Sequence, residues 1–144
     1  MFSRQRVLWF IFITVSASGC STYAPSEEDV ADVRKVLELR KQAIETENIE
    51  AYGKLIIDDY FDGRLNKEQL IAEMQSIFDQ YDEIKLTQQR APVEIKKNTA
   101  RVIQQVVYTA KGLEKPFIQL REKILVRNYK GQWLMSYGID MTQN

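Results

Sequence analysis

One carboxylate interrupts an apolar alternating pattern near the C-terminus. In the segment 116–128, alternate residues are large and aliphatic with one exception; the set is Ile118, Leu120, Glu122, Ile124 and Val126. Alternate residues of a strand share one face of a sheet, so we expect Glu122 to face the interior. A buried carboxylate costs free energy unless a partner satisfies it. Glu122 is therefore either a paired structural group or a functional group with a raised pKa, able to bind a ligand or transfer a proton.

Three polar residues on neighbouring segments could reach Glu122. Gln88 and Arg90 share one face of the first strand-like segment, and Gln104 lies on the second. Both faces of that second segment are mixed, so periodicity alone does not decide whether Gln104 points inward. We expect Arg90 to be the ion-pair partner of Glu122. Together the four residues would either bind a small polar ligand or form a hydrogen-bonded network within the core.

The composition excludes several classes of chemistry. The 144 residues include no histidine and a single cysteine, which excludes histidine-based nucleophile systems, histidine metal sites and intrachain disulfides. Twenty basic residues balance twenty acidic ones, so no excess of positive charge indicates nucleic-acid binding. Asp58, Asp59 and Asp62 lie close together but lack the ligand spacing of a calcium loop. We therefore expect no metal, no cofactor and no nucleic-acid partner.

The N-terminus has the pattern of a secretory signal. Arg4 and Arg6 precede an apolar run over residues 7–15, and small residues follow at 16–19. A membrane-spanning helix needs about 20 apolar residues, so this run is too short for a permanent span. The single cysteine, Cys20, comes directly after the small residues.

The segment 17–20, Ala-Ser-Gly-Cys, resembles the lipobox of bacterial lipoproteins, in which the cysteine receives a diacylglycerol and the preceding peptide is removed. This resemblance implies a signal peptide over residues 1–19, and then a lipidated Cys20 and a short tether over residues 20–26. It also implies a membrane partner, and Ser21 in place of aspartate implies the outer membrane, facing the periplasm. An ordinary cleaved signal or an uncleaved anchor would instead leave Cys20 unmodified.

The rest of the chain predicts helices followed by an antiparallel sheet. Apolar residues recur at helical spacing over about 27–46, after Asn48, and from Asn66 to about Tyr81. β-Branched and aromatic residues then dominate four segments separated by turn sequences, namely 84–95, 100–111, 116–128 and 132–140. We therefore predict an α+β fold in which three helices pack on a curved antiparallel sheet of four strands or slightly more.

The last predicted strand carries bulky side chains on one face. Trp133, Met135 and Tyr137 alternate there, whereas the opposite face has Leu134 as its one large apolar residue. We expect the bulkier face to pack against the helices or against a partner.

The order of the predicted elements, a helix pair, a third helix and four long strands, resembles that of the nuclear transport factor 2-like superfamily, also called cystatin-like, and three short segments add to the resemblance. They are residues 47–52 at the end of the helix pair, the acidic-aromatic segment 58–61, and residues 133–137 in the closing strand. The resemblance implies a cone-shaped α+β domain over residues 27–144. Members include isomerases, dehydratases, transport adaptors and accessory domains without chemistry. Enzymatic members often use an Asp–His pair, which this chain lacks, and no position here clearly matches their catalytic tyrosine or general-base aspartate.

These observations favour a lipid-anchored, non-catalytic binding or accessory domain of the bacterial cell envelope. It would contact a protein partner or a small ligand through its sheet or its cavity. Phe117 and Leu125 lie on the otherwise polar face of segment 116–128, which indicates that a partner or a second copy covers the sheet. The alternative is a cavity enzyme of the isomerase or hydratase type that uses Glu122. A titratable Glu122 in an enclosed cavity would favour the enzyme, and a saturated ion pair would favour the binding domain.

Overall fold

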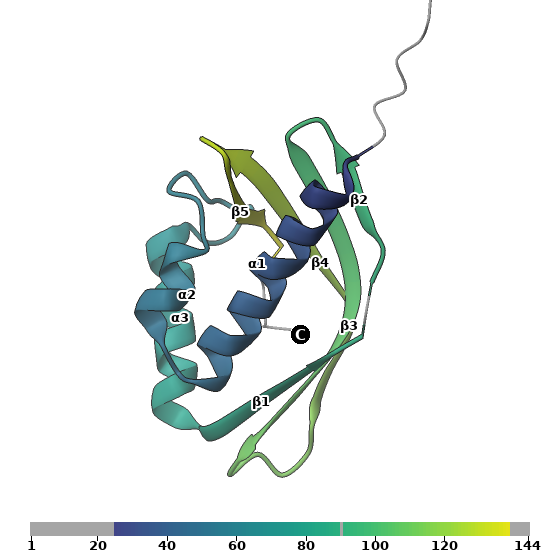
Figure 1. Ribbon diagram of the computed structural model, residues 1–144. Coiled ribbons are helices and arrows are strands. Elements are labelled where there is room, and N and C mark those ends of the chain that lie inside the picture. The colour runs from purple at the N-terminus through teal and green to yellow at the C-terminus, as the bar shows by residue number, and fades with distance from the viewer. Residues whose placement is uncertain (1–24, 90, 139–144) are drawn as a thin grey trace, which may run out of the picture.

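The protein folds as three helices followed by five strands. The computed structural model of the 144-residue chain describes residues 25–89 and 91–138. Its elements are, in chain order, α1 (Glu27–Glu45), α2 (Ile49–Lys54), α3 (Lys67–Gln80), β1 (Asp82–Gln88), β2 (Val93–Lys96), β3 (Thr99–Lys111), β4 (Phe117–Tyr129) and β5 (Gln132–Tyr137). The helices lie on one side of a curled sheet, which gives a half-barrel cone (Figure 1). The predicted α+β architecture is confirmed.

Each helix begins at a side-chain cap. Ser26, Asn48 and Asn66 each accept a hydrogen bond from the backbone N–H three residues further along the chain. These bonds satisfy N–H groups that have no partner inside the helix. At α3 the side chain of Gln69 also accepts the N–H of Asn66, which completes a capping box. The helix starts that the sequence predicts therefore have a local physical cause.

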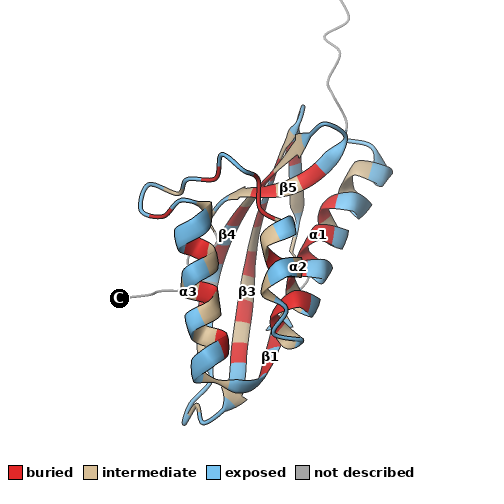
Figure 2. Cartoon of the chain, turned by 90° about the vertical axis from the view of Figure 1, so that its left-hand side faces the viewer, coloured by how far each residue is buried: buried red, intermediate tan, exposed pale blue. Residues whose placement is uncertain are grey.

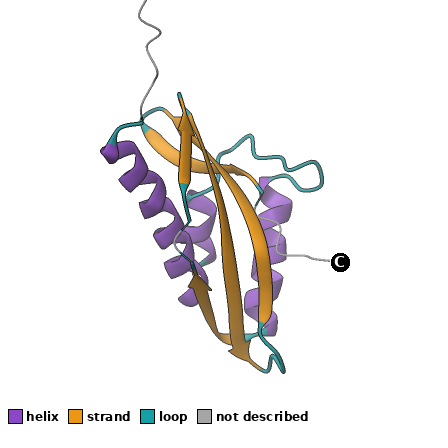
Figure 3. Cartoon of the chain, turned by 90° about the vertical axis from the view of Figure 1, so that its right-hand side faces the viewer, coloured by secondary structure: helices purple, strands orange, loops and turns teal. Residues whose placement is uncertain are grey.

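The sheet is antiparallel throughout. Its strands run in the order β1-β3-β4-β5, and β2 pairs with β3 beyond the end of β1 (Figure 3). The predicted continuous strand over 84–95 is wrong, because β1 ends at Gln88 and β2 begins at Val93. Pro92 lies in this interruption and has no N–H to donate to the sheet.

The core fills the space between the helices and the sheet, as the buried residues in Figure 2 show. Every buried hydrophobic residue described lies between Val33 and Met135. The described core is therefore built from a part of the chain that starts after the predicted tether. None of the described helices is long and apolar enough to cross a membrane.

A bulge in β4 reverses the predicted alternation on the N-terminal side of Glu122. Gln104 pairs with Glu122, but Val106 pairs with Gln119, so β4 uses one residue more than β3 over this interval. Glu122 is fully buried, as predicted. On the N-terminal side of the bulge, the predicted inward orientation of Ile118 is wrong, because Ile118 is 50% exposed while Gln119 is buried.

A second shift in register occurs between β4 and β5. Leu125 pairs with Tyr137, but Val126 pairs with Met135. Trp133 and Met135 are buried as predicted, whereas Tyr137 is 37% exposed. The inward-facing part of β5 therefore ends at Met135.

Candidate functional site

Glu122 lies in a buried ion pair with Arg40 of α1. Arg40 Nη2 lies 2.6 Å from Glu122 Oε1, and Arg40 Nη1 lies 3.1 Å from Glu122 Oε2. Both side chains are completely buried. This two-point contact matches the planar guanidinium to the carboxylate, the strongest arrangement for such a pair. The ion pair thus joins α1 to β4 through the centre of the core.

Two further side chains complete the hydrogen bonding of this carboxylate. Gln104 Nε2 donates to Glu122 Oε2 at 2.8 Å, and the Tyr108 hydroxyl donates to Glu122 Oε1 at 3.3 Å. Arg40 Nη2 also donates to the Tyr108 oxygen at 3.0 Å. Each carboxylate oxygen therefore accepts two hydrogen bonds. These four residues are called the Arg40–Glu122 cluster below.

Burial and pairing shift the pKa values in this cluster in opposite directions. Burial alone would raise the pKa of Glu122, but Arg40 and the hydrogen bonds to the carboxylate hold it below the usual value. Burial alone would lower the pKa of Arg40, but Glu122 keeps it well above its usual value. Burial raises the pKa of the neighbouring Tyr52 to about 12 and also raises the pKa of Tyr108. At neutral pH the cluster is therefore a charged pair surrounded by neutral phenols.

The structure brings together part of the set predicted from the sequence. Glu122 and Gln104 both point inward and are hydrogen-bonded to each other. Gln88 lies further out, where its Nε2 donates to Glu38 at 2.8 Å. Arg90 lies outside the described residues, and the partner that the structure shows for Glu122 is Arg40.

The burial of Arg40 was not predicted from the sequence, although its position in α1 indicates it. It is located between Leu37 and Ile44 on the apolar stripe of α1, three and four residues from these buried neighbours. A charged residue on an apolar stripe is the helical equivalent of Glu122 on its apolar strand face. Two opposite charges that each interrupt an apolar face are candidates for a buried pair.

A pocket of about 390 Å³ opens beside the cluster; it is called the apolar pocket below. It lies among α1, α3, β1 and the hairpin that joins β3 to β4. Its lining is mainly aliphatic and aromatic, with a few polar groups: Ile44, Glu73, Ser76, Ile77, Tyr81, Ile84, Tyr108, Thr109, Ala110, Leu113 and Phe117. Tyr108 belongs to both features, because its hydroxyl joins the cluster while its ring lines the pocket.

Phe117 also contributes to this pocket, so its predicted place on the outer face of the sheet is wrong. Its ring centroid lies 5.8 Å from that of Tyr108, and the two rings are tilted by 46°. The bulge in β4 is the cause, because it changes which residues face inward before Glu122. Phe117 therefore no longer supports a partner that covers the sheet.

The acidic residues after α2 are engaged in ion pairs and a turn. Asp58 accepts a hydrogen bond from Lys67 Nζ at 2.7 Å, and Asp59 pairs with Arg127. Asp62 accepts two backbone N–H groups of the turn that follows it. Within residues 25–89 and 91–138, no group of three or more histidine, cysteine or acidic residues could hold a metal ion.

Comparison with known proteins adds information on the fold. No protein-family model matches the sequence, and no curated protein is significantly similar to it. Among solved structures, Bd1075 of Bdellovibrio bacteriovorus is similar to this chain with a TM-score of 0.68 and 14% identity over 83% of this chain. The match covers 44% of Bd1075, so this chain spans less than half the length of that protein.

Two shorter proteins match over most of their own length. A nuclear transport factor 2-like protein of unknown function from Pseudomonas putida KT2440 has a TM-score of 0.68 and 16% identity, over 79% of this chain and 86% of that one. A candidate dehydratase of the same family from Streptomyces avermitilis has a TM-score of 0.64 and 15% identity, over 76% and 92%. The chain therefore has the nuclear transport factor 2-like fold, also described as cystatin-like. At such identities the likeness concerns the fold and does not assign an activity.

Proposed function

We propose that this protein is a non-catalytic binding domain, which holds a small, neutral and largely apolar molecule in the apolar pocket. The proposal rests on one observation: the charged groups of the Arg40–Glu122 cluster are buried, whereas the pocket beside them is open and mostly apolar. The carboxylate that could perform chemistry is closed within the Arg40–Glu122 cluster, while the neighbouring pocket is open and mostly apolar. The lipobox-like N-terminus supports the further proposal that a lipid anchors the domain in the bacterial cell envelope.

The geometry of the cluster argues against a cavity enzyme that uses Glu122. A general base must come within hydrogen-bond reach of the proton that it removes. Both oxygens of Glu122 are already occupied by donors from Arg40, Gln104 and Tyr108, and the side chain has no exposed surface. Tyr108 does reach the pocket, but its raised pKa keeps the hydroxyl protonated at neutral pH.

The lining of the apolar pocket selects a neutral ligand. Among the described residues, no lysine or arginine lines it, so an anionic ligand would lack a counter-charge. The lining carboxylate, Glu73, is already paired with Arg64 at 2.9 Å. The rings of Tyr81, Tyr108 and Phe117 offer surfaces for stacking. The hydroxyl groups of Ser76 and Thr109 offer hydrogen bonds. A small ring compound with few polar atoms fits this chemistry.

Filling the apolar pocket should abolish binding. We expect the neutral fluorescent probe N-phenyl-1-naphthylamine to bind residues 21–144, which contain the whole described core, with enhanced emission. The variant Ala110→Phe places a ring in the pocket and should weaken binding at least about tenfold, or about 1.4 kcal/mol. Fluorescence titration measures this effect. The matched control is Gln105→Phe, which adds a ring to the same strand at a position that does not line the pocket.

Two results would reject binding in this pocket. One is that the probe does not bind the unmodified domain, and the other is that Ala110→Phe and Gln105→Phe bind it equally well. The anionic probe 8-anilinonaphthalene-1-sulfonate should bind more weakly than the neutral one, because none of the described lining residues is a cation. Stronger binding of the anionic probe would contradict the proposed neutral ligand.

Lipid attachment is expected at Cys20, which lies outside the described residues. In a Gram-negative host, the full chain should incorporate labelled palmitate and sediment with the outer membrane. Cys20→Ser should abolish both, whereas Ser21→Ala should leave the labelling intact. Mass spectrometry should find a mature protein that begins at an acylated Cys20. A different N-terminus, or a free Cys20 thiol, would show that this proposal is wrong.

A further inference from the structure

A second pocket, of about 230 Å³, lies on the other side of the cluster and has a different chemistry. It is formed by α1, the end of β1, the start of β2 and the middle of β3. Its polar lining includes Arg34, Glu38, Gln88 and Gln104. It is called the polar pocket below. None of the described residues lines both pockets, so a variant can fill one without changing the lining of the other.

Two buried polar atoms at the polar pocket have no hydrogen-bond partner. Arg34 Nε is a buried donor without an acceptor, and Gln88 Oε1 is a buried acceptor without a donor. Nearly all buried polar atoms in folded proteins are hydrogen-bonded, so such exceptions point to a missing partner. None of the ion pairs among the described residues includes Arg34, and Glu38 accepts a hydrogen bond from Gln88. Arg34 thus offers a positive charge to this pocket.

A buried amide forms the inner end of the polar pocket. Gln104 is 5% exposed, and its Nε2 is fixed by donation to Glu122 Oε2. That bond leaves the carbonyl oxygen of the same amide as an acceptor. The Nε2 of Gln88 is likewise engaged, by Glu38, and leaves its carbonyl oxygen. Among its described lining residues, the pocket therefore combines the guanidinium of Arg34 with the amide oxygens of Gln88 and Gln104, which can accept further hydrogen bonds.

We infer that the polar pocket binds a small carboxylate that carries hydroxyl groups. The guanidinium of Arg34 would receive the carboxylate, since this pairing is planar and charge-assisted. The amide oxygens of Gln88 and Gln104 would accept hydrogen bonds from the hydroxyls. Glu38 at the rim adds negative charge, which favours a ligand with a single carboxylate over one with two.

Isothermal titration calorimetry with three six-carbon probes tests this inference. The full chain, purified in a nonionic detergent, is titrated with gluconate, sorbitol or hexanoate. Gluconate has both the carboxylate and the hydroxyls, whereas sorbitol lacks the carboxylate and hexanoate lacks the hydroxyls. We expect gluconate to bind at least about tenfold more tightly than either control, which corresponds to about 1.4 kcal/mol.

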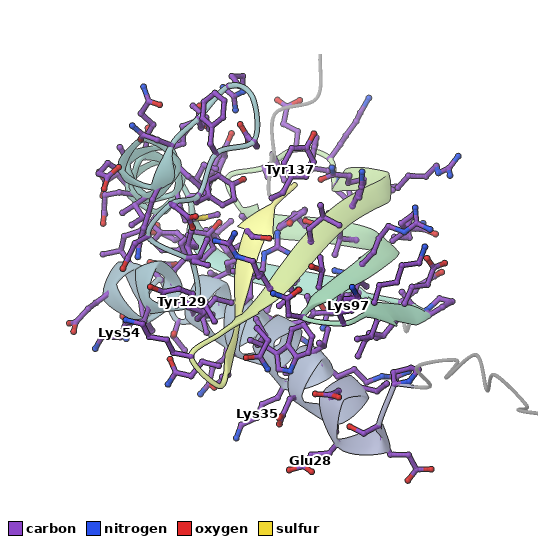
Figure 4. All side chains as sticks on the ribbon, turned by 90° about the horizontal axis from the view of Figure 1, so that it is seen from above. Glu28, Lys35, Lys54, Lys97, Tyr129 and Tyr137 are labelled. Carbon is purple, nitrogen blue, oxygen red and sulfur yellow. The ribbon has the colours of Figure 1, made fainter. Side chains whose placement is uncertain are left out.

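Variants locate the binding. Arg34→Met should weaken gluconate binding about tenfold or more, because it removes the cation and keeps the aliphatic stem. Lys35→Met is the matched control, because Lys35 points away from the sheet (Figure 4) and does not line the polar pocket. It removes one positive charge from the same helix and should leave the affinity within about twofold. Gln88→Leu supplies a second test should Arg34→Met fail to fold, and it should also weaken gluconate binding.

Three results would overturn the inference: no gluconate binding by the unmodified chain, equal binding of gluconate and hexanoate, or unchanged gluconate binding in both Arg34→Met and Gln88→Leu. Ala110→Phe, which fills the apolar pocket, should not change gluconate binding. The naphthylamine titration therefore tests the apolar pocket alone, and the gluconate titration tests the polar pocket alone.

Discussion

Replacing Arg40 with methionine is expected to lower the free energy of unfolding by about 3–5 kcal/mol. The change removes the guanidinium and leaves the Glu122 carboxylate buried, with hydrogen bonds from Gln104 and Tyr108 as its remaining support. A buried, unpaired charge is among the most destabilising features that a core can contain. Urea denaturation of residues 21–144, followed by circular dichroism, measures the loss. Lys41→Met is a matched control, because Lys41 is only partly buried and takes no part in the cluster.

The double variant Arg40→Met, Glu122→Leu should recover most of that loss. Replacing both charges with apolar groups of similar size removes the desolvation cost together with the attraction, so the net change is small or even favourable.

The stability of the unmodified protein should depend on pH through Glu122. The pKa of Glu122 is lowered in the folded state, so its contribution to the free energy of unfolding is fully present above its ordinary pKa and is lost as the pH falls through the folded value. The double variant should lack this part of the acid sensitivity. A loss below about 1 kcal/mol in Arg40→Met would show that water reaches the carboxylate.

The cluster shows what strand and helix periodicity can predict. Glu122 was identified because a period of two places it among aliphatic residues, and its burial follows directly from that pattern. Arg40 interrupts the apolar stripe of α1 in the same way, with the helical period of 3.6. Its burial is harder to predict, because a long basic side chain on a helix often extends its charged end to solvent. Which cation meets which carboxylate depends on how α1 crosses the sheet. That crossing is a tertiary property, which the local pattern does not contain.

The register shifts in β4 and β5 mark where the predicted alternation fails. One extra residue in β4 exchanges the inner and outer faces of the strand before Glu122. Ile118 is therefore exposed, and Phe117 lines the apolar pocket. The segment before Glu122 has apolar side chains on both faces, so the sequence carries no local sign of the exchange. The apolar pocket depends on this bulge for one of its rings. Regular strand alternation therefore cannot predict a site that depends on a register shift.

The Arg40–Glu122 cluster also separates the two pockets. Tyr108 extends from the ion pair into the wall of the apolar pocket, and Gln104 extends from the same pair into the polar pocket. Both side chains are held by hydrogen bonds to Glu122, so their positions are fixed before any ligand arrives. Preorganised polar groups lower the entropic cost of binding. A buried ion pair that adds little net stability can thus have a positioning role on both sides.

Replacing Trp133 with alanine is expected to cost about 3–5 kcal/mol of unfolding free energy, the usual range for emptying a large aromatic site. The side chain is 6% exposed and lies on β5, beside buried Met135. Backbone hydrogen bonds in both directions tie Met135 to the segment after α2, through Leu55 O at 2.8 Å and Ile57 N at 3.0 Å. The cavity left by the indole would therefore lie where β5 meets the helices, and the surrounding structure could close it only in part.

Tyr137→Ala is the matched control for this variant. Regular alternation would place Tyr137 on the same face as Trp133, but the register shift leaves it 37% exposed, next to the Lys123 ammonium group 5.4 Å from its ring centre. Its removal should cost less than about 1 kcal/mol, because a surface aromatic with a cation neighbour contributes little. Urea denaturation of both variants compares two aromatic residues that regular alternation would place on the same face of β5. Similar losses for the two would mean that β5 continues its alternation through Tyr137 and that the shift does not occur in solution.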